Sequence, residues 1–209
     1  MRRYGPALAL LGAAALLSAQ AAPGLAAAPL YRVEIVVFRS TVALGSPENW
    51  AEESSAAGIS PAGTGPTAAT STAERSALDV LPSADFALDG TAESLRRSGR
   101  YVVIAHAAWT QLASPWGRPL EIPIGSLGID VPGLGGTIAL ERGEFLHLAV
   151  RLHYAASDPP PGLGASPGTV FVLDQVHRVR FNERNYFDHP AFGVIALVTP
   201  VKPSASAPR

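Results

Sequence analysis

Five histidines are the side chains of this sequence best suited to binding a metal ion or transferring a proton. His147 and His153 share one face of an extended stretch, but six residues of strand separate them by roughly 20 Å. Two histidines that far apart cannot bind one metal ion. The chain also lacks cysteine, which excludes thiolate ligands and disulfides. We therefore expect no metal site.

Two other short patterns resemble parts of hydrolytic sites. Asp188 and His189 are residue types of a catalytic triad, but neighbours on an extended chain point in opposite directions and cannot orient one another. A turn capped by Asp188 is the simpler interpretation. The glycines of 133–136 lack the lysine of a phosphate-binding loop. The sequence thus predicts no catalytic residue, no cofactor and no enzymatic activity.

Arginine and aromatic side chains gather near the C-terminal end of the chain. Arg178 and Arg180 would share one face of a strand, and Arg184 and Tyr186 follow in the next turn. A guanidinium binds a carboxylate through two parallel hydrogen bonds, and an aromatic ring offers a flat apolar face to a sugar. These four residues are candidates for ligand binding.

Each candidate also has a simpler interpretation. The arginines would otherwise form a solvated strand face, paired with Asp174 and Glu183. Trp109 is a fifth candidate for ligand binding, because its ring could stack on a sugar. A tryptophan beside Ala107 and Ala108 at the end of a strand is, however, more often part of a hydrophobic core.

The elements that must position these residues are mostly strands. Residues 31–38 alternate, with apolar side chains on one side and Arg32 and Glu34 on the other, which is typical of a strand. Further strands are predicted over 100–109, 120–124, 169–181 and 193–199. We expect a bulge near Gln175, where the apolar alternation falters. Residues 92–97 form a short helix that Gly99 ends.

A hairpin over residues 137–154 is the clearest local prediction. Its second strand carries an apolar face formed by Leu146, Leu148, Val150, Leu152 and Tyr154. A two-residue turn would leave the apolar faces of the two strands mismatched. The three-residue loop Arg142-Gly143-Glu144 instead pairs Leu140 with Leu146 and Ile138 with Leu148, and we predict this loop.

The predicted fold class is α+β: one mainly antiparallel β-sheet with one or two short helices, in a single domain over residues 29–200. Residues 51–77 are dominated by Ala, Ser, Thr, Gly and Pro. Such a segment buries too little apolar surface to offset the entropy of ordering it, so we predict a disordered insertion. The tail over 201–209 is polar and is expected to be disordered.

Residues 1–21 have the pattern of a removed export signal. Arg2 and Arg3 precede an apolar run, and small residues then allow cleavage at residue 21 or as late as residue 28. The run is shorter than a membrane span of roughly 20 residues. Without the signal the chain carries 14 basic and 17 acidic residues, a balance unsuited to nucleic acid. We expect an exported protein with no span in its mature form and no nucleic-acid partner.

Four short segments, taken together and in their order along the chain, resemble the motifs of a known family. They are Tyr31–Arg39 with Glu48-Asn49-Trp50, the strand that ends in His106-Ala107-Ala108-Trp109-Thr110-Gln111, the hairpin segments 136–142 and 145–148, and Arg178-Val179-Arg180 with 186–194. Together they resemble the CsiV family of periplasmic peptidoglycan-binding proteins. The chain departs from the family at Asn185, where histidine is common, and at His177, where the family has a second arginine. The resemblance therefore carries over no binding residue.

The resemblance implies a periplasmic, non-catalytic accessory protein that binds peptidoglycan and supports cell-wall synthesis or cell shape. A cell-wall synthase, or the lipoprotein that activates it, would be a further partner. The competing hypothesis is a protein–protein adaptor that docks such a synthase or an envelope lipoprotein without binding glycan. Crosslinking with and without digestion of the wall separates the two.

Overall fold

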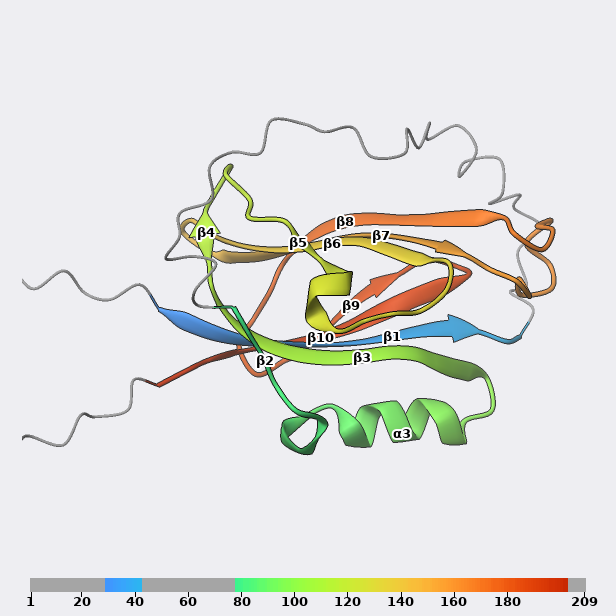
Figure 1. Cartoon of the computed structure of the whole chain (residues 1–209), viewed down its shortest axis with the longest axis horizontal. Helices are drawn as coiled ribbons and strands as arrows, with labels where there is room; N and C mark the ends of the chain where they lie inside the picture. The colour runs from blue at the N-terminus through green and yellow to red at the C-terminus, as the bar shows by residue number, and fades with distance from the viewer. Residues whose placement is uncertain (1–28, 43–77, 203–209) are drawn as a thin grey trace, which may run out of the picture.

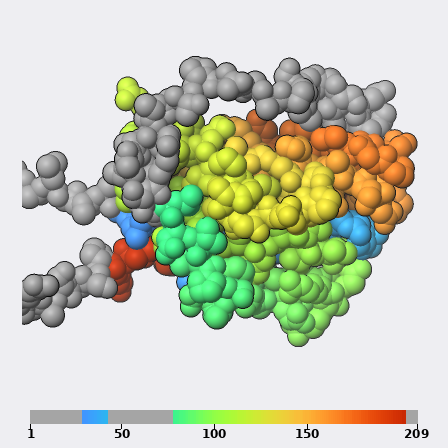
Figure 2. Space-filling view, in the orientation of Figure 1, coloured from blue at the N-terminus to red at the C-terminus, as the bar shows by residue number. Residues whose placement is uncertain are grey.

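The computed structural model describes residues 29–42 and 78–202 and shows two β-sheets stacked face to face, with one α-helix on the outside (Figure 1). Figure 2 shows in the same view that the second sheet and its connections, yellow to orange, lie above the first sheet and the helix. The predicted signal (1–21), the predicted insertion (51–77) and residues 203–209 lie outside the described residues.

The first sheet has five strands in the order β2-β3-β1-β10-β9, all of them antiparallel. Their bounds are Leu30–Ser40 for β1, Asp79–Val80 for β2, Tyr101–Leu112 for β3, Arg184–Asp188 for β9 and Phe192–Pro200 for β10. The long apolar strand β10 lies inside this sheet between β1 and β9, which explains why six of its nine residues are buried.

The second sheet follows the order β4-β6-β7-β8, and β5 also pairs with β6. Its strands are Ser114–Pro115 (β4), Ile122–Pro123 (β5), Leu134–Arg142 (β6), Leu146–Ala155 (β7) and Val170–Arg178 (β8). The α+β fold class is confirmed, but the strands divide between two sheets where one was predicted. The strand predicted over 120–124 is reduced to β5, because the chain turns into a 3-10 helix, η2, at Ile124–Leu127.

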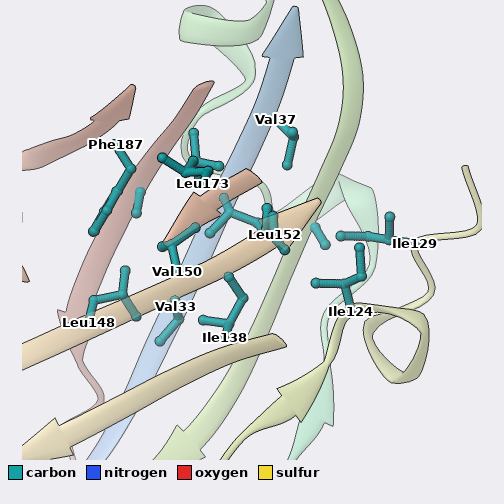
Figure 3. Packing of buried hydrophobic residues seen from close by; sticks show 14 of the residues in the cluster. Val33, Val37, Ile124, Ile129, Ile138, Leu148, Val150, Leu152, Leu173 and Phe187 are labelled. Carbon is teal, nitrogen blue, oxygen red and sulfur yellow. The ribbon is translucent and has the colours of Figure 1, made fainter. Parts of the chain in front are cut away.

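The main core lies between the two sheets (Figure 3). Val33 and Val37 of β1 face Leu148, Val150 and Leu152 of β7. All five side chains are at most 1% exposed. The alternation along β1 and β7 therefore holds, because each strand turns its apolar side to the opposite sheet.

A second apolar cluster lies on the outer face of the first sheet, beneath helix α3 (Asp89–Arg97). Leu88 and Ala92 pack there on Val36 and Ile195. The helix ends at Arg97, as the sequence predicts, but it begins three residues before the predicted start at residue 92. A short 3-10 helix, η1 (Ser83–Asp85), precedes it.

The predicted loop of the β6–β7 hairpin is wrong by one residue. Arg142 pairs with Leu146 and Leu140 with Leu148, so the loop consists of Gly143, Glu144 and Phe145. The observed and predicted registers place the same side chains in the core, and the apolar pattern cannot separate them. In the observed register Phe145 leaves the strand and contacts Arg178 of the neighbouring strand.

The predicted bulge near Gln175 is also wrong, since the β7–β8 register runs without a shift from Ala155–Val170 to His147–Arg178. The alternation falters for another reason. Gln175 and His177 point to the inner side at the open edge of the sheet, where they meet β9: Gln175 donates to the backbone oxygen of Asp188 (3.0 Å), and the His177 ring stacks on Phe187.

Candidate functional site

The structure places the predicted ligand-binding residues on opposite faces of the sandwich. Arg178 lies on the outer face of the second sheet, in the row of β8 that alternates with the buried residues Phe171 and Leu173. Arg184 and Tyr186 lie on strand β9 rather than in the predicted turn, because residues 184–188 pair with β10. They alternate there with the buried Phe187 and lie on the outer face of the first sheet. The four candidates therefore do not form one cluster.

Arg180 lies beyond the end of β8 rather than on it. The strand stops at Arg178, the Val179 amide donates to the Leu146 oxygen, and the chain then turns toward β9. The Arg180 guanidinium lies 3.8 Å from the Glu183 carboxylate, and both side chains are exposed. For Arg180 the structure thus shows the solvated ion pair that was the simpler interpretation, and an exposed pair of this kind contributes little to stability.

Trp109 belongs to the core. Its side chain is fully buried, and the indole Nε1 donates to the Gln111 side chain at 2.5 Å. A ring enclosed in this way has no face open to a ligand, so we leave Trp109 out of the candidate site. Burial of the ring together with a hydrogen bond for its N–H is the ordinary state of a core tryptophan.

A different group of side chains forms a continuous row on the outer face of the second sheet. The centres of the Trp116 and His147 rings lie 4.2 Å apart. His147 of β7 stands opposite Arg178 of β8 in the strand pairing. The Arg178 guanidinium carbon in turn lies 3.4 Å from the centre of the Phe145 ring. We call Trp116, His147, Arg178 and Phe145 the aromatic–arginine row. Trp116 is 55% exposed and Phe145 38%.

Trp116 is presented by the tight turn that follows β4, in the connection that projects at the upper left of Figure 1. The Arg118 amide donates to the Pro115 oxygen and closes the turn, and Gly117 has the positive φ (79°) that its third position requires. Two hydrogen bonds fix the turn to β6: the Trp116 amide donates to the Arg142 oxygen, and the Gly117 amide to Glu141 Oε1 at 2.8 Å.

The rest of this face is a network of ion pairs. Arg151 lies 3.0 Å from Glu121 and 3.3 Å from Asp174, and Thr137 donates to Glu121. The charge of Arg151 is thus balanced by two carboxylates. Within residues 29–42 and 78–202, by contrast, no carboxylate pairs with the Arg178 guanidinium, whose flat side rests on Phe145 instead.

A second polar cluster lies between the first sheet and the start of α3. The Glu34 carboxylate is fully buried and accepts hydrogen bonds from His106 Nε2 (2.8 Å), the Leu88 amide (2.7 Å), the Ala87 amide (2.8 Å) and Arg32 (3.2 Å). Burial raises the pKa of Glu34, but these hydrogen bonds together outweigh burial, so the pKa lies below its usual 4.5.

His106 connects this carboxylate to the helix. A carboxylate can only accept hydrogen bonds, so Nε2 of His106 carries a proton, while Nδ1 lies 3.5 Å from Asp89, the first residue of α3. All partners of Glu34 and His106 are internal, and the cluster fastens residues 85–89 to the sheet. We assign it a structural role.

In the described part of the chain, no group of three or more His, Asp or Glu side chains is arranged to hold a metal ion. No helix of that part is long and apolar enough to cross a membrane.

No pattern in the sequence predicted a site that contains Trp116, His147 and Phe145. The Ser114–Gly117 turn was visible as a Pro-Trp-Gly pattern, which indicates an exposed aromatic ring at a turn. Its position beside His147 depends on the β4–β6 pairing, which joins two segments 27 residues apart along the chain (Ser114 with Glu141) and has no signal in the local pattern.

These features define a mainly-β, two-sheet α+β protein whose outer face combines exposed aromatic rings with an arginine that has no carboxylate partner among the described residues. Comparison with known families then shows the family to which the chain belongs. The chain belongs to the family described as "Peptidoglycan-binding protein, CsiV", whose profile matches residues 7–201 and so spans both sheets. Comparison with curated proteins and with solved structures finds no significant match.

Proposed function

We propose that this protein is a periplasmic, non-catalytic accessory protein that binds peptidoglycan and supports cell-wall synthesis or cell shape. The observation that carries the proposal is membership of a peptidoglycan-binding family over residues 7–201. The predicted export signal supports a location outside the cytoplasm, where the cell wall is accessible.

The surface we propose for binding is the outer face of the second sheet around Arg178. Peptidoglycan presents carboxylates beside amino sugars, and a guanidinium without a carboxylate partner is suited to bind them. Arg178 meets that condition among the described residues, whereas Arg151 on the same face is already paired with Glu121 and Asp174. Arg180 follows at the same end of β8 and is included in the surface, although its guanidinium lies 3.8 Å from the Glu183 carboxylate. An exposed pair of this kind is weak, so Arg180 can exchange Glu183 for a ligand carboxylate.

Co-sedimentation with purified sacculi tests the proposal. The wild-type mature protein should pellet with sacculi, and the double variant Arg178→Ala/Arg180→Ala should pellet at least about tenfold less, the loss expected for one charge-assisted hydrogen-bond pair. An unchanged thermal transition of the variant would show that the fold is intact. A wild-type protein that stays in the supernatant would contradict the proposed function.

The matched control is the double variant Arg184→Ala/Tyr186→Ala, which removes the two predicted residues on the opposite face. We expect it to pellet like the wild type. If this control loses binding while Arg178→Ala/Arg180→Ala keeps it, the binding surface lies on the first sheet instead. A protein partner that stays crosslinked in cells after the wall is digested would favour the adaptor hypothesis.

A further inference from the structure

We propose that the aromatic–arginine row is the site that recognises the ligand, and that it takes an N-acetylated amino sugar with a carboxylate beside it. The sugar ring would stack on Trp116, and the carboxylate would bind the Arg178 guanidinium. The inference rests on the proposed function and deepens it, because it assigns each part of the ligand to a side chain.

Trp116 is suited to stacking because it is both exposed and held in place. An exposed tryptophan forgoes the hydrophobic stabilisation that a core position would give, yet 55% of Trp116 is exposed. The turn that carries it is fixed through Gly117, whose amide donates to Glu141, a side chain that is only 6% exposed. Gly143 lies against the root of the Trp116 side chain, where an added Cβ would come within 3.2 Å of the Trp116 Cβ. A ring held in this way loses little entropy when a sugar binds.

Arg178 supplies the charged half of the site. The flat side of its guanidinium rests on Phe145, which leaves the N–H groups at the edge of the guanidinium directed away from the ring. Stacking on an aromatic ring fixes the plane of the fork and so pre-orients it for a carboxylate. The Phe145 ring is available for this role because it lies in the hairpin loop rather than in β7.

His147 connects the Trp116 side of the aromatic–arginine row with the Arg178 side. It lies beneath the Trp116 ring and opposite Arg178 in the β7–β8 pairing. Its Nδ1 is buried and has no hydrogen-bond partner within the described residues. Buried polar atoms in native proteins are nearly always paired. His147 therefore keeps one unused hydrogen-bonding position among the described residues, where the Trp116 and Arg178 sides of the row meet.

The distance between Trp116 and Arg178 along the row suits a ligand that carries both a sugar ring and a carboxylate. Glu141, His147 and Arg178 stand opposite one another on three consecutive strands, about 5 Å apart from strand to strand. Trp116 lies over the first half of this span and Phe145 beside its end. A sugar ring on Trp116 therefore places a substituent of that sugar near Arg178.

Two soluble probes test this division of roles. One is a muropeptide, a disaccharide of N-acetylglucosamine and N-acetylmuramic acid with its stem peptide, and the other is an N-acetylglucosamine tetramer, which has no carboxylate. Trp116→Ala should weaken both by about tenfold, equivalent to about 1.4 kcal/mol for one stacking contact. Arg178→Ala should weaken the muropeptide by about tenfold or more and leave the tetramer unchanged. Binding is measured by calorimetry and by the change of tryptophan fluorescence.

The chain offers a matched control for each substitution. Tyr186 is as exposed as Trp116 (57% against 55%), and Arg184 is an exposed strand arginine like Arg178, but both lie on the opposite face. Tyr186→Ala and Arg184→Ala should bind both probes like the wild type. Glu141 is a positioning residue: Glu141→Ala should reduce the fluorescence response to both probes, and Glu141→Gln, which still accepts from Gly117, should restore it.

The outcomes separate this inference from the proposed function. If wild-type protein pellets with sacculi but Trp116→Ala and Arg178→Ala bind both probes normally, the inference is wrong and the proposed function stands. The same holds if the wild type pellets but binds neither probe. If the wild type does not pellet with sacculi, the proposed function is wrong and the inference falls with it.

Discussion

At the scale of single residues, the buried carboxylate of Glu34 is the polar group on which the fold depends most. We expect Glu34→Gln to lower the free energy of unfolding by about 3 kcal/mol, because an amide cannot accept from all four donors that now surround the carboxylate. Urea denaturation would measure the loss. Glu183→Gln is the control, since its exposed pair with Arg180 should contribute at most about 1 kcal/mol.

Two residues make stability fall with acid. Burial lowers the pKa of His189 below 6.5, although Asp188 acts to raise it, and Nδ1 of His189 accepts from the Ala191 amide, which a protonated ring could not allow. The pKa of Glu34 is lowered below 4.5. For both groups the stabilising form is the deprotonated one, so each contribution is complete above the unfolded-state pKa and is lost as pH falls through the folded-state pKa.

We therefore expect the free energy of unfolding to decline in two steps, the first below about pH 6.5 from His189 and the second below about pH 4.5 from Glu34. Urea titrations between pH 8 and pH 3 would show them. His189→Gln should flatten the upper step and leave the lower one. Stability that is constant over this range would contradict both assignments.

At the scale of elements, α3 is held by its apolar contacts as well as by Glu34. Leu88 is 1% exposed and packs with Ala92 on Val36 and Ile195. We expect Leu88→Ala to cost about 2–5 kcal/mol, the range for a buried leucine replaced by alanine. Leu95→Ala, on the partly buried side of the same helix, should cost less. Equal effects in thermal or urea denaturation would mean that the helix is not anchored at its first turn.

At the scale of the whole molecule, the stacking of two sheets makes the two sides of β8 unequal. Leu173 points into the core and is 2% exposed, whereas Val176 on the other side is 42% exposed. Leu173→Ala should cost about 2–5 kcal/mol, and Val176→Ala should change stability by no more than about 0.5 kcal/mol. A sheet open on both sides would show two similar, small effects in the same urea experiment.

The sequence by itself determined the long strands, the inward-facing residues of β1 and β7, the end of α3 at Arg97 and the class of the fold, but not the short strands β2, β4 and β9. These follow from alternation, apolar runs and glycine positions, which act between residues close together in the chain. The family resemblance was visible for the same reason, since its motifs are short and contiguous. Trp109 is the ambiguous case, because a core ring and an exposed ring have the same local pattern.

Only the tertiary structure decided that there are two sheets, that the hairpin loop is 143–145, that Arg178 and Tyr186 lie on opposite faces and that Glu34 is buried. Each depends on which strand or loop packs beside another distant in sequence. Moving the hairpin loop by one residue shifts the strand pairing by two and so leaves the same side chains in the core. A solvent-side glutamate is buried only when residues 87 and 88 fold over it. Contacts between distant segments form through packing and long-range pairing, and the local pattern of a chain does not encode them.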